Sequence, residues 1–254
     1  MFRIKTNEDI VVYTIIITLL ATLASAFVVY HATKQVYQSL PEFRVSMTLA
    51  VGIPLLVAGP ISALALTIIK RVNSAVDKLE YFVKFDPLTG VLTRNYFLES
   101  VRRRFSRGGA LFLVDADYFK NINDTFGHDV GDEALQIIGR TLNLSTNKYD
   151  LAGRVGGEEF ALFFPNMPAA EVAHKAEQIK QAICDNGKTI GKHKIDLTVS
   201  IGIAQISKGS TLTILFKEAD ENLYVAKRSG RNRCVWSREE GDLDQLKLGP
   251  SVTH

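Results

Sequence analysis

The sequence predicts an α+β fold, a central β-sheet flanked by helices, preceded by a hairpin of two membrane-spanning helices. Two long uncharged apolar runs lie in the first third of the 254 residues. The remainder combines short apolar runs, typical of buried strands, with amphipathic patterns typical of helices. Hydrophobic residues make up 46% of the chain. This composition suits one globular domain plus a segment that enters lipid.

The two apolar runs are each long enough to cross a bilayer as a helix. No charged residue occurs from Ile10 to Tyr30 or from Val45 to Ile69, and about 20 apolar residues span the hydrocarbon core. Pro54 and Pro60 interrupt the second run, where a membrane helix tolerates proline and a kink is expected. A cleaved signal peptide is an alternative for the first run, because Ala24-Ser25-Ala26 resembles a cleavage site. The run is longer than a typical signal core.

Basic residues around the runs predict that both termini lie in the cytoplasm. Arg3 and Lys5 precede the first run. Four basic residues follow the second: Lys70, Arg71, Lys78 and Lys84. Because basic residues stay on the cytoplasmic side, we expect a multi-pass protein of the inner (cell) membrane with its C-terminal domain in the cytoplasm. The external loop is too short to fold as a sensor, so a stimulus would act through the spans, the lipid bilayer or an unidentified membrane sensor partner.

An apolar stripe follows the second run. It consists of Val72, Val76, Leu79 and Val83. Steps of four and three residues are the spacing of a two-stranded coiled-coil seam, and they also suit a helix that packs on its own domain. The stripe therefore predicts either a homodimer contact or self-packing.

The charge and the cysteines exclude some classes of function. The net charge is only +3, and no dense stripe of Lys and Arg with interleaved aromatic residues occurs, so nucleic-acid binding is not expected. Cys184 and Cys234 lie far apart, without the short spacing of metal or redox sites. We expect two buried, reduced thiols.

The C-terminal part alternates between strand and helix patterns. The apolar run from Ala110 to Val114 predicts a strand buried on both faces, and it ends in Asp115-Ala116-Asp117. An amphipathic helix is indicated by Val130, Ala134, Ile138 and Leu142. Residues 154–163 predict two short strands joined at Gly156-Gly157. The remaining expected elements are a helix over 169–184, a strand over 197–204, a helix over 212–229 and a strand near Cys234.

Acidic residues at the ends of these strands suggest a site for a hard cation. Mg²⁺ binds one or two carboxylates together with phosphate oxygens and water. Asp115 and Glu158, on neighbouring strands, would form such a nucleotide-phosphate site. Spacing alone leaves open that both are solvated acids at strand ends.

Several motifs in order resemble the GGDEF family of diguanylate cyclases from Asp86 to Trp236. They are Asp86-Pro87-Leu88-Thr89-Gly90-Val91-Leu92-Thr93-Arg94, Asp115 to Asp124, Gly127 to Asp132, Gly156-Gly157-Glu158-Glu159-Phe160, Ala219 to Tyr224, and Ala226 to Asn232. The resemblance implies a GGDEF-type sheet of the nucleotide cyclase/polymerase palm-like kind. It also implies condensation of two GTP into cyclic di-GMP, with Mg²⁺ as cofactor, Mn²⁺ as an alternative, and a homodimer for turnover.

The resemblance also implies a role for individual residues. The metal would be held by Asp115, the carbonyl of Ala116, Glu158 and, as a further ligand, Glu159. The catalytic residues would be Lys120 and the proton acceptor, Glu158 or Glu159. The substrate would be bound by Asn123, His128, Asp132, Lys227, Arg231, Gly156 and Gly157. The glycines would let the backbone approach the phosphates, which a Cβ would obstruct.

Two of these roles have structural alternatives, and two positions depart from the family pattern. Asp132 follows Asp129 by three residues and suits a helix cap, and Lys227 near a helix end suits the helix dipole. Thr93 stands where the family usually has Asn, with Asn95 in place of an Arg. Many family members also carry Arg-x-x-Asp, a product-binding inhibitory site, before the signature; here the Arg position holds Asn147.

The predicted organisation assigns every part of the chain. The segments are a cytoplasmic N-terminus 1–9, spans 10–30 and 45–69, an external loop 31–44, a linker helix 70–85, the GGDEF domain 86–236 and a disordered tail 237–254. An alternative function is a catalytically silent GGDEF module that senses nucleotide or recruits a partner to the membrane. Such a module is expected to lack an acid, a glycine or a phosphate-binding cation, and none is missing here.

Overall fold

The computed structural model describes residues 6–34, 36 and 40–236. The chain divides into two compact units, residues 1–81 and residues 82–254. Arg3, Lys5 and the tail predicted for residues 237–254 lie outside the described residues.

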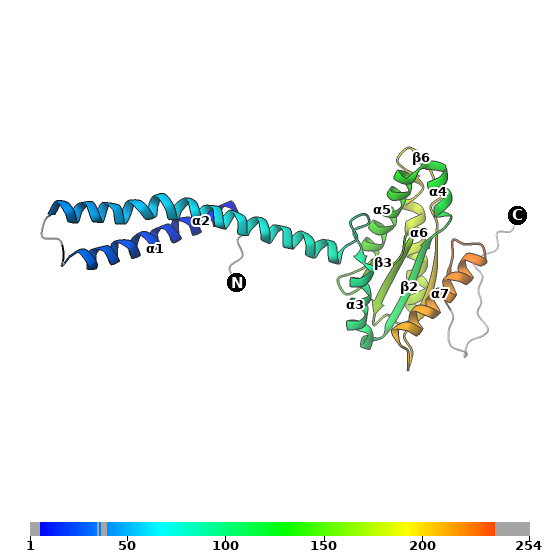
Figure 1. Cartoon of the computed structure of the whole chain (residues 1–254). Helices are drawn as coiled ribbons and strands as arrows, with labels where there is room; N and C mark the ends of the chain where they lie inside the picture. The colour runs from blue at the N-terminus through cyan, green and yellow to red at the C-terminus, as the bar shows by residue number, and fades with distance from the viewer. Residues whose placement is uncertain (1–5, 35, 37–39, 237–254) are drawn as a thin grey trace. The chain divides into compact units, whose positions relative to one another are not determined.

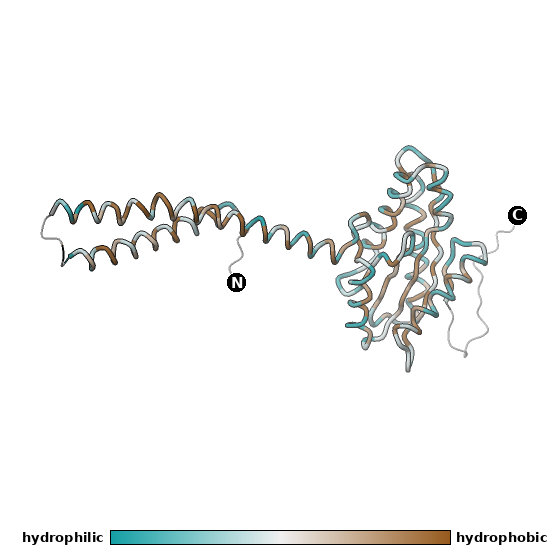
Figure 2. The backbone as a smooth tube through the Cα atoms, viewed as in Figure 1, coloured by the Kyte–Doolittle hydropathy of each residue, from teal (hydrophilic) through white to brown (hydrophobic). Residues whose placement is uncertain are grey.

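The first unit is a pair of long apolar helices (Figure 1). Helix α1 covers Asn7–Thr33, and helix α2 covers Leu40–Lys84 and remains one helix through its two prolines. The start of α1 contacts α2 through a hydrogen bond that Lys70 donates to the Asn7 side chain (2.5 Å). Large apolar side chains face outward, with Leu56 78% exposed, and apolar positions run along both helices in Figure 2. Both helices are long and apolar enough to cross a membrane.

The second unit contains a six-stranded mixed sheet in the order β1-β3-β4-β2-β7-β8. Its strands are β1 (Leu92–Thr93), β2 (Gly109–Ala116), β3 (Leu151–Arg154), β4 (Glu159–Pro165), β7 (Val199–Gln205) and β8 (Cys234–Trp236). The central strands pair antiparallel, whereas the edge strands β1 and β8 pair parallel to β3 and β7. A separate small hairpin is formed by β5 (Thr189–Ile190) and β6 (His193–Lys194).

Helices cover both faces of this sheet (Figure 1). One face packs against α4 (Phe119–Phe126), α5 (His128–Ser145) and α6 (Ala169–Asn186), and the other against α3 (Arg94–Arg104) and α7 (Leu212–Arg228). A short 3-10 helix, η1 (Phe105–Arg107), follows α3. Strand β2 is buried on both faces, as its apolar run predicts: Phe112 belongs to one core and Leu111 to the other. The predicted α+β class is therefore confirmed.

Helix α7 lies unusually close to the sheet, and this closeness determines where its C-terminal end lies. A Cβ at Gly202 of β7 would clash with the backbone of α7 at Ala219 and Leu223. Buried Asn222 of α7 donates a hydrogen bond to the Ile203 carbonyl (2.7 Å). The last turn of α7 is thereby held next to the end of β2.

The entry into the second unit is fixed by polar side chains. Thr93 donates a hydrogen bond to the Val83 carbonyl in the last turn of α2 (2.7 Å), so the residue that replaces the usual Asn anchors the turn to the linker helix. Asp86 accepts hydrogen bonds from the amide and the hydroxyl of Thr89 (2.9 and 2.6 Å). The apolar stripe on α2 is exposed, with Leu79 at 64% and Val83 at 68%.

Some expectations from the sequence need correction. The cysteines are free but half-buried rather than buried, because Cys234 lies on the edge strand β8. Burial nevertheless raises the pKa of the Cys234 thiol to about 12. The sequence does not predict helices α3 and α4, the 3-10 helix η1 or the two-residue strands β1, β5 and β6, and the strand expected from residue 197 begins at Val199.

Candidate active site at the end of β2

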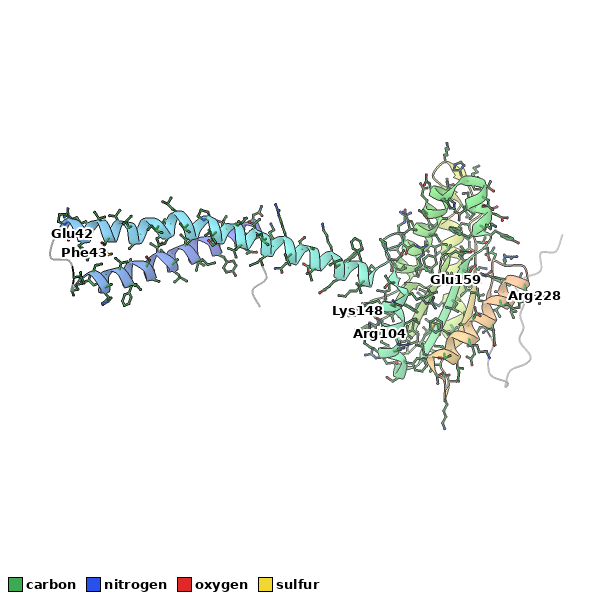
Figure 3. The ribbon with its side chains drawn as sticks, viewed as in Figure 1. Glu42, Phe43, Arg104, Lys148, Glu159 and Arg228 are labelled. Carbon is green, nitrogen blue, oxygen red and sulfur yellow. The ribbon has the colours of Figure 1, made fainter. Side chains whose placement is uncertain are left out.

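The sheet brings acidic residues from neighbouring strands to the end of β2. Asp115 is opposite Glu159 of β4 and Ser200 of β7 in the strand register. The amide of Ala116 donates a hydrogen bond to the Glu158 carbonyl (3.3 Å). Asp115 is buried, and Glu159 is exposed (labelled in Figure 3).

A basic residue from α7 completes this acidic edge. The ammonium of Lys227 forms an ion pair with Oδ2 of Asp115 at 2.7 Å. Burial raises the pKa of Asp115, Lys227 lowers it, and the charges of Glu158 and Glu159 raise it further, so that the net shift is upward. The charges of Glu158 and Glu159 thus disfavour the ionised form of Asp115, and a cation bound here would favour it. Lys227 therefore pairs with a specific carboxylate, in addition to any interaction with the dipole of α7.

The turn between β3 and β4 is clamped by an arginine. Arg154 donates two hydrogen bonds to the Gly157 carbonyl, from Nε (3.0 Å) and Nη2 (2.6 Å). Its Nη1 reaches Oδ1 of Asp86 at 3.2 Å. Burial opposes ionisation of Asp86, but the hydrogen bonds from Thr89 and the charge of Arg154 outweigh it and lower the pKa of that carboxyl. The domain entry and the turn are thus linked through one side chain.

The two glycines of the turn have different surroundings. A Cβ at Gly156 would clash with the Glu159 carboxylate, whereas a Cβ at Gly157 would meet no atom within 4 Å. A side chain at position 156 would therefore require the exposed Glu159 side chain to shift. A role in phosphate approach stays a prediction for both glycines.

The predicted guanine-binding residues lie where α4 meets α5. The Asn123 amide packs against Gly131, the residue before Asp132. His128 and Asp132 are exposed in the first part of α5. The residue before α5 is Gly127, and no side-chain cap bond forms there. The capping alternative for Asp132 is therefore not supported.

Two further basic residues lie beside β2. Arg231, in the turn after α7, stacks over the Tyr118 ring with its guanidinium 4.4 Å from the centroid, and Nη1 contacts the Tyr118 hydroxyl at 3.3 Å. Lys120 is exposed in the first turn of α4. Lys120 and Arg231 thus come from the two segments that follow β2 and α7, the elements that carry Asp115 and Lys227.

A family model described as "Diguanylate cyclase, GGDEF domain" matches residues 83–233. The chain belongs to the GGDEF family. Among curated relatives, the response regulator PleD of Caulobacter vibrioides is 40% identical over 159 residues, covering 59% of this chain and 35% of PleD. Diguanylate cyclase DgcM of Escherichia coli is 36% identical over 165 residues, covering 63% of this chain and 40% of DgcM. The chain therefore spans well under half the length of these relatives.

Solved structures of GGDEF proteins share the fold. The coiled coil and GGDEF domain of DgcB from Caulobacter crescentus, in complex with c-di-GMP, has a TM-score of 0.63 at 27% identity, covering 68% of this chain and 95% of that one. Diguanylate cyclase SiaD of Pseudomonas aeruginosa, in complex with its activator SiaC, has a TM-score of 0.59 at 26% identity and covers 91% of each chain.

Oxygen atoms at the end of β2 and in the adjacent signature turn suit a hard cation. Asp115 and Glu158 would contribute carboxylates, and Ala116 would contribute a carbonyl. Within residues 6–34, 36 and 40–236, no group of three or more His, Cys, Asp or Glu side chains is gathered closely enough to hold a metal alone. Two carboxylates with phosphate oxygens from a ligand are the arrangement that Mg²⁺ typically uses. The residues present therefore fit a magnesium–nucleotide pair better than a dedicated metal cage.

One hollow adjoins this site and another lies apart from it. One, of about 460 Å³, lies between α3 and α7, and among the residues predicted for the site only Glu159 lines it. The other, of about 440 Å³, is lined by Asn147 and Asp150 together with residues of α6. Burial raises the pKa of Asp150, while a hydrogen bond from Asn147 and the charges of Lys175 and Arg104 oppose the rise. The sequence does not indicate Arg104 (labelled in Figure 3) as a neighbour of Asp150, because Arg104 comes from α3, which is distant in the chain.

The arginine clamp leads to a testable prediction. In an Arg154→Lys variant the charge remains but the fork that binds the Gly157 carbonyl is lost. We expect turnover to fall by roughly tenfold, the worth of one charge-assisted hydrogen bond, with little change in the melting temperature. The control is Arg103→Lys, which alters an exposed pair with Glu99. If steady-state kinetics give the same turnover for Arg154→Lys and Arg103→Lys, the contact of Arg154 with Gly157 does not contribute to catalysis.

Proposed function

We propose that this protein is a diguanylate cyclase, which condenses two GTP into cyclic di-GMP and releases two pyrophosphates. The observation that carries the proposal is the buried Asp115 carboxylate, which lies at a strand end beside the signature turn and faces Lys227. Acids for a metal and cations for a triphosphate thus meet at one edge of the sheet. Incubation of the full chain with GTP and Mg²⁺, followed by separation of the nucleotides, tests the proposal.

The proposed reaction forms two bonds and breaks two. The 3′-hydroxyl of each GTP attacks the α-phosphorus of the other, and the bond to the β-phosphate breaks. Glu158 or Glu159 accepts the hydroxyl proton, and Lys120 stabilises the charge that develops on the phosphate. Mg²⁺, or alternatively Mn²⁺, held by Asp115, Glu158 and the Ala116 carbonyl, would lower the pKa of the attacking hydroxyl and screen the phosphate charge.

The chain's own residues would position the two substrates. Asn123 and Asp132 would bind the guanine edge, and His128 would lie along the nucleotide. Lys227 and Arg231 would neutralise the triphosphate. Because we expect each domain to bind one GTP, two domains must pair face to face, and the exposed apolar stripe on α2 supports pairing in a homodimer. Helices α1 and α2 would anchor that dimer in the cell membrane with both domains in the cytoplasm.

Pairing predicts a dependence on enzyme concentration. Removal of residues 1–85 should lower specific activity about tenfold or more at nanomolar enzyme, because tethering raises the effective concentration of the second domain. A leucine zipper fused in the right register should restore the activity, whereas a monomeric helix of equal length should not. If the truncated domain matches the full chain at that concentration, the stripe is not a dimer contact.

Control by product is expected to be weak. The Arg of the family's inhibitory motif is replaced by Asn147, and a neutral amide lacks the charged fork that binds guanine or phosphate. Asp150 accepts a hydrogen bond from the backbone N–H of Asn147 (2.9 Å). Progress curves with added cyclic di-GMP should therefore show little inhibition. Micromolar inhibition that disappears in Asp150→Ala would overturn this prediction, and its loss in Arg104→Gln would identify the substitute cation.

A further inference from the structure

Unfavourable backbone conformations gather around one buried carboxylate beside the candidate site. Among the described residues, four that are not glycine have a positive φ: Tyr118 (53°), Asn166 (59°), Arg231 (62°) and Asn232 (46°). Tyr118 directly follows Asp117, the Asn232 amide donates a hydrogen bond to it, and Arg231 lies between them as the neighbour of Asn232 that stacks on Tyr118. Such conformations persist only where the surroundings enforce them, and they concentrate at functional sites.

Asp117 provides the contacts that hold these segments. Its side chain is buried (3% exposed). Oδ1 accepts a hydrogen bond from Ser200 (2.7 Å), and Oδ2 accepts hydrogen bonds from Thr198 (2.8 Å) and from the backbone amide of Asn232 (2.9 Å). The carboxylate therefore joins the end of β2 to the start of β7 and to the turn after α7. A buried carboxylate needs such partners.

The turn after α7 is the segment that carries the basic residues. Residues 229–233 connect α7 to β8, and Gly230, Arg231 and Asn232 all have positive φ. The turn begins two residues after Lys227, the partner of Asp115. Arg231 stacks on Tyr118, the residue next to Asp117. A displacement of this turn would move Arg231 away from Tyr118 and from the end of β2.

We propose that Asp117 is a positioning residue that fastens the turn after α7 to the end of β2 and thereby orients Arg231 toward the substrate phosphates. The part concerning phosphates rests on the proposed function. The carboxylate acts through its accepted hydrogen bonds, not through contact with substrate. An amide can preserve these contacts, because its oxygen can take the place of Oδ2 while the Ser200 hydroxyl turns to accept from its nitrogen.

The first test follows the turn itself and needs no activity. Hydrogen exchange at the Asn232 amide should become at least about tenfold faster in Asp117→Ala, since its acceptor is gone, and stay near wild type in Asp117→Asn. Asp196→Ala, which removes an exposed acid shortly before β7, is the control and should leave exchange unchanged. Protection of Asn232 in Asp117→Ala equal to wild type would overturn the proposal. Asp117→Ser, which keeps one acceptor, replaces the alanine variant if that variant does not fold.

The second test asks whether Asp117 acts through Arg231. Asp117→Ala should raise the KM for GTP about tenfold, the effect of one charge-assisted hydrogen bond, and should change kcat less. Asp117→Asn should have a KM close to that of the wild type. In an Arg231→Ala background the same substitution should add little. Additive effects, or a loss of kcat that parallels a general loss of exchange protection, would show a merely structural role. A wild type that does not convert GTP would refute the proposed function, and the exchange experiment would still decide whether Asp117 holds the turn.

Discussion

Replacing Glu158 by Gln should reduce turnover by roughly 10²–10³-fold, the range seen when one preorganised charged or polar group is removed from an active site. The amide has the same shape but no charge for a hard cation. The fold should survive, because the contact of Glu158 with β2 runs through its backbone carbonyl, which accepts from Ala116 (3.3 Å).

The matched control is Glu221→Gln, which removes one charge from an exposed position on α7. Glu158→Gln should keep the circular dichroism spectrum of the wild type but lose its activity. Glu221→Gln should keep both the spectrum and the activity. A normally folded Glu158→Gln enzyme with full activity would remove Glu158 from the mechanism.

Discrimination between GTP and ATP should also be large. If Asp132 accepts from guanine N1–H and the 2-amino group, adenine leaves the carboxylate without donors. An unpaired polar group costs roughly 1–3 kcal/mol, or about 5- to 150-fold in kcat/KM. Asp132→Ala should reduce the preference, whereas Asp129→Ala, at another exposed acid on α5, should not. Equal use of ATP and GTP by the wild type would refute this role.

The fold could be predicted where one local pattern decides the structure. The apolar run of β2 reads as a strand buried on both faces, and the acids after it mark the strand end at which a site forms. Helix α3 was missed because its buried Phe97 and Val101 lie beside three consecutive arginines at its end. Strands β1, β5 and β6 have two residues each, too few to show any alternation.

The contacts that organise the candidate site could not be predicted, because they join distant parts of the chain. Asp86 and Arg154 are 68 residues apart, and Asp117 and Asn232 are 115 apart. Their positions lie within or beside recognised motifs, but a motif does not state which partner a side chain meets. Gly156 shows the same limit: the contact of its backbone with the Glu159 side chain is visible only in the structure, and the predicted approach of phosphate stays a prediction.

The most direct test of the proposed function is the identity of the product formed by the full chain in detergent with GTP and Mg²⁺. We expect cyclic di-GMP with two pyrophosphates per molecule, at a rate that rises faster than linearly with dilute enzyme. Glu158→Gln, assayed beside it, should yield almost none. Folded wild-type protein that binds GTP with Mg²⁺ at concentrations where it is dimeric, and releases neither product, would contradict the assignment and identify a silent nucleotide-sensing module instead.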